Sequence, residues 1–165
     1  MVRGELLLKW LFYLILLVIT ISLFTIVIPY FFFPGFFFPH HIGTGDDLAN
    51  VSLSLRADNQ LQTLTNVYVF MNDHFSNERY YLYLQFYKHF YISADKLILN
   101  DQFLPCHLQS LVAKSLLIST GQFSEGDFHE RITLSRGLMI HKFFEVRVGD
   151  NSYLFDSFLD KFGKL

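Results

Sequence analysis

The most apolar stretch of the chain lies near its N-terminus. Residues 10–38 read WLFYLILLVITISLFTIVIPYFFFPGFFF and contain no charged side chain. A membrane-spanning helix needs roughly 20 such residues, whereas the apolar region of a cleavable signal peptide is usually about 7–15 residues long and precedes a small-residue cleavage site. The pattern therefore predicts an uncleaved transmembrane helix over residues 10–33, followed by an aromatic collar and linker over residues 34–47.

Charged residues on either side of this stretch predict its orientation. Arg3 and Lys9 precede it, and Asp46 and Asp47 come before the next basic residue. Basic residues favour the cytoplasmic side of a membrane. We therefore predict a single-pass membrane protein with a cytoplasmic N-terminus at residues 1–9 and a C-terminal domain on the extracytoplasmic side.

The C-terminal domain, residues 48–165, begins with apolar residues at helical spacing. Leu61, Leu64, Tyr68 and Met71 recur every three or four positions, which is the spacing of one face of a helix. This spacing therefore predicts one or two helices at the start of the domain.

Two further helices are predicted before the pattern changes. Residues 75–91 form one of them, and the other runs from Cys106 to about Thr120. Proline suits the start of a helix and glycine its end, as Pro105 and Gly121 do here. Cys106 then lies in the first turn, where the backbone N–H groups and the helix dipole favour a thiolate over a thiol.

The last third of the chain alternates apolar and polar residues as strands do. Strands are predicted over about 128–134, 138–148 and 152–159, with a turn at Gly149–Asp150. Helices followed by neighbouring strands are typical of an α+β fold, here with helices packed on an antiparallel sheet.

Composition narrows the classes of function. The chain has 13 Lys+Arg and 15 Asp+Glu, a formal net charge of −2, whereas nucleic-acid binding needs a basic patch. The seven histidines show none of the spacings typical of zinc ligands, so we predict no metal, no cofactor and no nucleic-acid partner. The lone cysteine cannot form an intramolecular disulfide and is a candidate reactive thiol.

The predicted hairpin brings a histidine and an aspartate together. With Gly149–Asp150 as its turn, His141 and Asp156 lie on the same face as diagonal neighbours, about 7–8 Å apart at the backbone. A carboxylate there can hold the imidazole in one tautomer and leave its other nitrogen to accept a proton from Cys106. Two plainer interpretations stay open: ordinary polar residues on a sheet, and a cysteine that is a small buried hydrophobe.

Two segments, CHLQSLVAKSLLISTGQF and HKFFEVRVGDNSYLFD, together resemble the transglutaminase-like superfamily, whose core is papain-like. The resemblance implies that Cys106 is the nucleophile, His141 the general base and Asp156 the residue that orients the base. The chain departs from the usual pattern at three positions. Leu104 replaces a glycine two residues before the cysteine, Phe143 replaces a tryptophan, and Ser157 replaces a proline.

The resemblance implies a membrane-anchored thiol enzyme that acts on amide bonds of a protein or peptide, as a cysteine protease, an amidase or an acyl transferase. The backbone N–H of Cys106, with the side chain of Asn100 or Gln102, would form its oxyanion hole. The alternative is a catalytically inactive transglutaminase-like domain that serves as a membrane-tethered binding or assembly module. The pattern leaves the substrate, the choice between water and amine as acceptor, and the oligomeric state open.

Overall fold

A computed structural model describes residues 2–23, 42–43, 45–75, 93–99, 103–135 and 139–165. Two compact units make up the chain, Met1–Phe37 and Phe38–Leu165, and each is described by itself.

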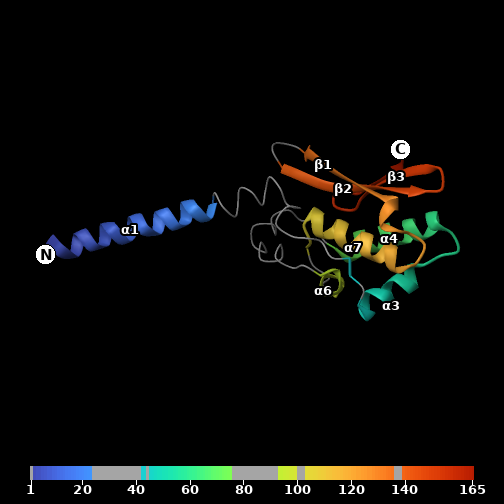
Figure 1. The fold of residues 1–165 in the computed structure, drawn as a ribbon, viewed down its shortest axis with the longest axis horizontal. Coiled ribbons are helices and arrows are strands. Elements are labelled where there is room, and N and C mark those ends of the chain that lie inside the picture. The colour runs from blue at the N-terminus through green and yellow to red at the C-terminus, as the bar shows by residue number, and fades with distance from the viewer. Residues whose placement is uncertain (1, 24–41, 44, 76–92, 100–102, 136–138) are drawn as a thin grey trace. The chain divides into compact units, whose positions relative to one another are not determined.

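The N-terminal unit contains one described helix, α1, at Val2–Ser22 (Figure 1, blue). No helix among the described residues is long and apolar enough to cross a membrane, so the predicted transmembrane helix over residues 10–33 is wrong. The helix begins well before the apolar stretch and includes Arg3, Glu5 and Lys9.

The rest of that predicted span and the aromatic collar, residues 24–41, lie outside the described residues. The predicted orientation and extracytoplasmic location depended on the span, and nothing in the described structure tests them.

Four α-helices are described in the C-terminal unit, α3 (Asp46–Leu55), α4 (Gln60–His74), α6 (Ala94–Ile98) and α7 (Cys106–Ser119), together with a short 3-10 helix at Glu125–Asp127. The pattern at residues 48–74 thus forms two helices. Asn59 separates them, because its side-chain oxygen accepts a 2.8 Å hydrogen bond from the N–H of Gln62 and caps α4. The helix predicted at residues 75–91 lies outside the described residues.

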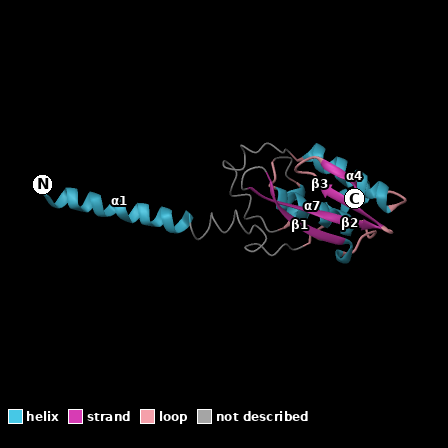
Figure 2. Cartoon of the chain, turned by 90° about the horizontal axis from the view of Figure 1, so that it is seen from above, coloured by secondary structure: helices cyan, strands magenta, loops and turns pink. Residues whose placement is uncertain are grey.

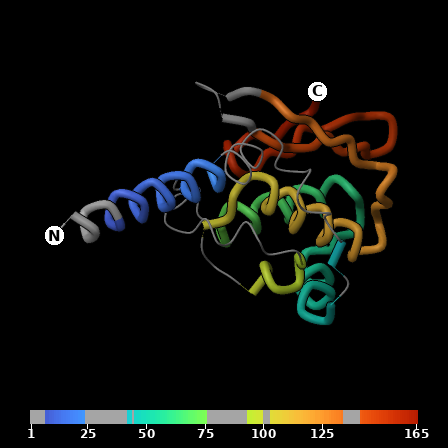
Figure 3. Tube along the Cα trace, turned by 60° about the vertical axis from the view of Figure 1, so that its left-hand side comes forward, coloured from blue at the N-terminus to red at the C-terminus, as the bar shows by residue number. Residues whose placement is uncertain are grey.

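Helix α7 is the centre of the unit. It contacts α3, α4, α6 and strand β2, and Figures 1 and 3 show these helices arranged around it. A helix that is apolar on most of its circumference is buried on most sides, and ten residues of α7 are buried. The predicted bounds are confirmed to within a residue, with Pro105 as N-cap and Gly121 in the left-handed region at φ +73°.

Four strands form one antiparallel sheet in the order β1-β2-β3-β4. They are β1 (Phe128–Ser135), β2 (Met139–Val148), β3 (Asn151–Asp156) and β4 (Lys161–Lys164). The two-residue turn at Gly149–Asp150 is confirmed, since Val148 pairs with Asn151 and Gly149 adopts φ +58°.

The third predicted strand, 152–159, is too long. It ends at Asp156, and β4 then runs back beside it. The chain turns there because carboxylates accept hydrogen bonds that close the loop. Asp156 Oδ1 accepts from the N–H of Leu159 at 3.1 Å, and Asp160 Oδ1 accepts from Tyr68 at 2.7 Å and from Asn72 at 2.9 Å.

The sheet covers the helices through one apolar face (Figure 2). Phe144 and Val146 of β2 and Phe155 of β3 belong to the same buried cluster as Leu108 and Val112 of α7. The α+β class is therefore confirmed for the described part of the chain. The first residue of α7 and the start of β2 meet on this framework, which is where the candidate site lies.

Candidate active site

His141 and Asp156 form a buried hydrogen-bonded pair between β2 and β3. The distance from His141 Nε2 to Asp156 Oδ2 is 2.7 Å, and the two side chains are 4% and 5% exposed. The register Phe144↔Phe155 places them one step apart diagonally across the hairpin, as the sequence predicts. An ionised carboxylate only accepts hydrogen bonds, so the N–H at Nε2 donates the hydrogen bond to Asp156. Nδ1 is then the nitrogen left for another partner.

Aromatic rings surround this imidazole. Phe143 stacks on it at 5.8 Å between ring centroids and an interplanar angle of 23°, and Phe158 lies at 5.8 Å and 37°. Phe103, next to the loop before α7, packs edge-on against Phe158 at 6.3 Å. Rings of this size exclude water and limit rotation of the imidazole.

The carboxylate of Asp156 is fixed at both oxygens. Oδ2 accepts from His141, and Oδ1 accepts from the backbone N–H of Leu159 in the turn after β3. A carboxylate held in two directions keeps its partner in one orientation, which a surface aspartate does not do.

Cys106 reaches the same imidazole from the other side. It is the first residue of α7 and is half-buried, and it is close enough to His141 to affect the pKa of the imidazole. Burial lowers the pKa of His141, but the hydrogen bond to Asp156 and the interactions with Cys106 outweigh this effect and raise the pKa from 6.5 to about 9. The imidazolium form of His141 is therefore favoured at neutral pH.

The three predicted site residues are thus brought together in one place. The side chains lie in the order cysteine, histidine, carboxylate, with Nε2 of His141 bonded to Asp156 and Nδ1 left for another partner. This arrangement can store a thiolate beside an imidazolium and pass one proton between the sulfur and a reacting group.

The loop before Cys106 shows how one departure from the transglutaminase-like pattern is accommodated. Leu104, which stands where glycine is usual, is fully buried in the helix core rather than at the surface of the site. Asn100 and Gln102, the predicted oxyanion-hole residues, lie outside the described residues.

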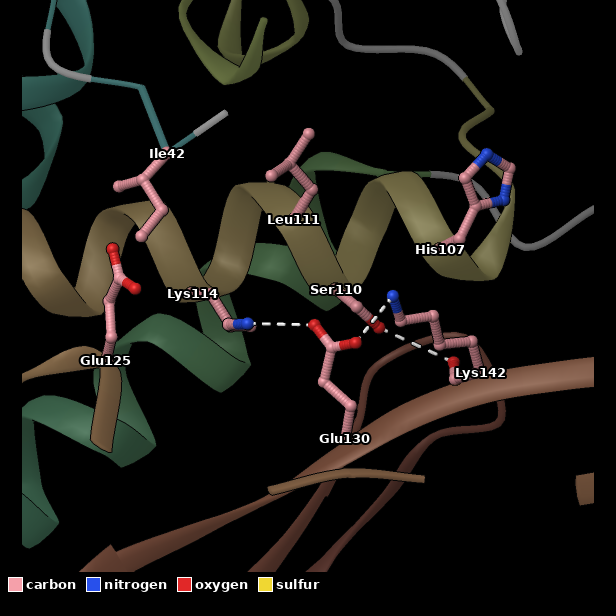
Figure 4. Close-up of a pocket in the computed structure, with 8 residues that line it drawn as sticks. All are labelled: Ile42, His107, Ser110, Leu111, Lys114, Glu125, Glu130 and Lys142. Carbon is pink, nitrogen blue, oxygen red and sulfur yellow. Dashed lines mark hydrogen bonds and ion pairs between the residues drawn. The ribbon is translucent and has the colours of Figure 1, made fainter. Parts of the chain in front are cut away.

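A second charged cluster, which the sequence reasoning missed, borders the site. Glu130 of β1 bridges Lys114 of α7 and Lys142 of β2, with both N–O distances 2.8 Å. Figure 4 shows the two ammonium groups converging on this carboxylate beside a cavity of about 240 Å³. Ser110, one turn of α7 after Cys106, donates a 3.4 Å hydrogen bond to the carbonyl of Lys142.

The charges of this cluster compensate one another. Burial raises the pKa of Glu130, but the hydrogen bonds and charges of Lys114 and Lys142 outweigh it and lower the pKa to about 2. One signal in the sequence could have found the cluster. Strand alternation places Lys142 on the same face as Phe144 and Val146, and a charged residue on a buried face needs a charged partner.

A buried side-chain amide, also missed, joins the two halves of the site. Gln109 Nε2 donates to the carbonyl of Leu104 at 2.9 Å, and its Oε1 accepts from the hydroxyl of Ser157 at 2.8 Å. Leu104 lies two residues before Cys106, and Ser157 directly follows Asp156.

No group of three or more His, Cys, Asp or Glu side chains in the described part of the chain is arranged to hold a metal ion. The chain matches no protein-family model, no curated protein and no solved structure. The resemblance to the transglutaminase-like superfamily therefore stays a prediction that rests on the residues quoted for it.

Proposed function

We propose that the C-terminal unit is a transglutaminase-like thiol enzyme that acts on amide bonds of a protein or peptide substrate. One observation carries the proposal: the buried imidazole of His141 is hydrogen-bonded to Asp156, and Cys106, the first residue of α7, is close enough to the same imidazole to raise its pKa. Ordinary polar residues on a sheet have no reason to converge in this way, and a cysteine that only fills space needs no imidazole partner.

The reaction follows from the positions of these groups. The Cys106 thiolate attacks the carbonyl carbon of the amide, and the C–N bond breaks as Nδ1 of the His141 imidazolium gives its proton to the leaving amine. A thioester remains on the sulfur. Water or a second amine then attacks the thioester while neutral His141 takes a proton from it, and the sulfur leaves as the thiolate. Asp156 holds the tautomer throughout and does not take the proton itself.

The departures from the usual pattern are compatible with this chemistry. The Leu104 side chain is buried in the core, so it does not stand between solvent and the sulfur. Phe143 stacks on His141 and so presents an aromatic ring to the imidazole, as the usual tryptophan would. Ser157 offers a hydroxyl where the family has proline, and that hydroxyl bonds Gln109.

Alkylation of Cys106 tests the proposal. Iodoacetamide reports on this residue alone, because the chain has one cysteine. The increase in intact mass over time gives the rate of alkylation. At neutral pH we expect His141→Gln to slow alkylation about tenfold or more, since an unassisted thiol holds only a few per cent thiolate there. The matched control is His129→Gln, at an exposed position of β1, and should react at the wild-type rate.

The alternative function predicts the opposite result. If His141→Gln and wild-type protein react equally slowly while both stay folded, Cys106 has no working base. The domain is then better explained as a catalytically inactive binding or assembly module.

A further inference from the structure

We propose that Gln109 is a positioning residue that clamps the segment before Cys106 to the turn after Asp156, and so sets the contact between Cys106 and His141. The inference rests on the proposed function, because it assigns a role at that same site. Gln109 touches none of the three reacting side chains in the contacts described above; it acts on the chain on either side of them.

Both ends of the Gln109 amide are used, and their direction is defined. A carbonyl oxygen only accepts hydrogen bonds, so Nε2 is the atom that faces Leu104 O at 2.9 Å. Oε1 is then the atom that accepts from Ser157 Oγ at 2.8 Å. The side chain is about 1% exposed, so water does not compete for either bond, and a flip of the amide would lose the bond to Leu104, because two carbonyl oxygens would then face each other.

The clamp joins two layers of the fold at the point where the site needs them joined. Cys106 belongs to the helix layer, whereas Asp156 ends a strand of the sheet. The segment before Cys106 has an apolar anchor in Leu104, and the turn after Asp156 begins at Ser157. A proton transfer between sulfur and imidazole tolerates little displacement, and misplacement by about 1 Å can cost on the order of a hundredfold in rate. A fixed bond between the two layers limits that displacement.

The chain contains a matched control at the other end of α7. Gln122 Nε2 donates to the carbonyl of Ala57 at 2.7 Å, and Gln60 Nε2 donates to the carbonyl of Gln122 at 2.6 Å. These amides also join segments that are distant in the sequence, but they lie beyond the C-terminal end of α7, whereas Cys106 is its first residue. Losing one of them costs stability without affecting the site.

The experiment compares four changes in the full chain, of which Gln122→Met is the control. Gln109→Met keeps the side-chain volume and removes both bonds, Ser157→Ala removes one bond, and Ser157→Thr keeps the hydroxyl. The first readout is the titration midpoint of the His141 imidazole by NMR, and the second is the rate of Cys106 alkylation at neutral pH. Thermal unfolding verifies that each variant is folded.

In Gln109→Met we expect the His141 midpoint to move from about 9 toward the ordinary value of 6.5, and alkylation to slow on the order of tenfold to a hundredfold. Ser157→Ala should show part of both changes, and Ser157→Thr should restore the wild-type behaviour. Gln122→Met should lower the unfolding temperature and leave the His141 midpoint and the alkylation rate unchanged.

The inference is overturned if folded Gln109→Met keeps the wild-type His141 midpoint, or if Gln122→Met shifts it equally. Either result would reduce Gln109 to a general packing residue. Failure of the proposed function looks different, because alkylation would then not depend on His141 in any variant. The NMR titration decides the role of Gln109 in that case too, since it needs no enzymatic activity.

Discussion

His141 and Lys142 are consecutive residues of β2, and both have a buried side chain that pairs with a carboxylate at 2.7–2.8 Å. Their partners differ. Asp156 is almost completely buried and serves His141, whereas Glu130 is 42% exposed and is shared by Lys142 and Lys114. The imidazole has a second partner, the side chain of Cys106, whereas Glu130 is the one charged partner described for the ammonium group of Lys142.

The difference separates a reactive pair from a structural one. The low pKa of Glu130 keeps its carboxylate charged over the whole neutral range, so its contacts with Lys142 and Lys114 hold the strands and α7 together without a change in its charge. His141 can exist as imidazole or imidazolium: Asp156 and Cys106 favour the imidazolium, and burial favours the neutral form. Two pairs of similar geometry, one residue apart, therefore differ in that the charge of one can change near neutral pH, which the proposed proton transfer requires.

Removing the carboxylate charge of Asp156 should give the largest difference between the two pairs in Cys106 alkylation. Asp156→Asn leaves a single side-chain oxygen for two donors, His141 Nε2 and the N–H of Leu159, so one of these bonds is lost and the imidazole loses its negative partner. We expect Cys106 alkylation at neutral pH to fall about tenfold or more, with a stability loss of about 1–2 kcal/mol. Kinetics of alkylation and urea unfolding measure the two effects.

One control and one contradicting outcome accompany this prediction. Asp150→Asn, in the exposed Gly149–Asp150 turn, should change neither quantity. A loss of stability in Asp156→Asn with unchanged alkylation would make Asp156 a structural cap on β3 and would remove the contrast with Glu130.

The second prediction concerns the structural pair. Glu130→Gln leaves the buried Lys142 ammonium without its charged acceptor, which should cost about 1–3 kcal/mol of unfolding free energy and leave Cys106 alkylation at the wild-type rate. Adding Lys142→Met to that variant removes the uncompensated charge and should recover much of the loss. Urea unfolding of the single and double variants checks this. If alkylation fell along with stability in Glu130→Gln, the two pairs would be one coupled network.

The third prediction concerns the pH range over which each pair, His141–Asp156 and Lys142–Glu130, contributes to stability. The pKa of His141 is raised to about 9, so its pairing should stabilise the fold fully below pH 6.5, with that contribution lost as the pH rises from 6.5 through 9. The pKa of Glu130 is lowered to about 2, so its contribution should be present above pH 4.5 and lost as the pH falls through 2. The Glu130 effect should be the smaller of the two, because solvent screens its half-exposed carboxylate.

Urea unfolding across the pH range measures both contributions. His141→Gln should remove the loss of stability between pH 6.5 and 9. Glu130→Gln should remove the loss of stability below pH 4.5. A wild-type profile that stayed flat between pH 6.5 and 9 would show that His141 gains no proton on folding.

Local signals explain which parts of this structure could be predicted from the sequence. Pro105 and Gly121 delimit α7, and the Gly149–Asp150 turn sets the register that brings His141 and Asp156 together. Each of these depends on residues within a few positions of one another. The position of Cys106 beside His141 was predicted with help from a family resemblance, because no local rule places a helix start against a strand.

The features that were missed depend on contacts distant in the sequence. Glu130 meets Lys114, and Gln109 meets Ser157, only after the sheet has packed on α7. Strand β4 was missed because the turn at Asp160 is made by hydrogen bonds from Tyr68 and Asn72 of α4. The transmembrane prediction failed for another reason. Hydropathy locates apolar residues and not the bounds of a helix, and the described helix α1 covers Val2–Ser22, with three charged residues in its first half.

The two-residue turn at Gly149–Asp150 has a consequence for the order of folding. Hairpins with short turns close within microseconds, because little chain entropy is lost before the strands pair. His141 and Asp156 belong to such a hairpin, whereas Cys106 joins them only when α7 docks from much farther back along the chain. We expect the base and its carboxylate to assemble before the nucleophile arrives, and, on unfolding, the thiol to separate first. A newly synthesised or partly opened molecule would then expose a thiol that has no base beside it, which keeps it unreactive until the fold is complete.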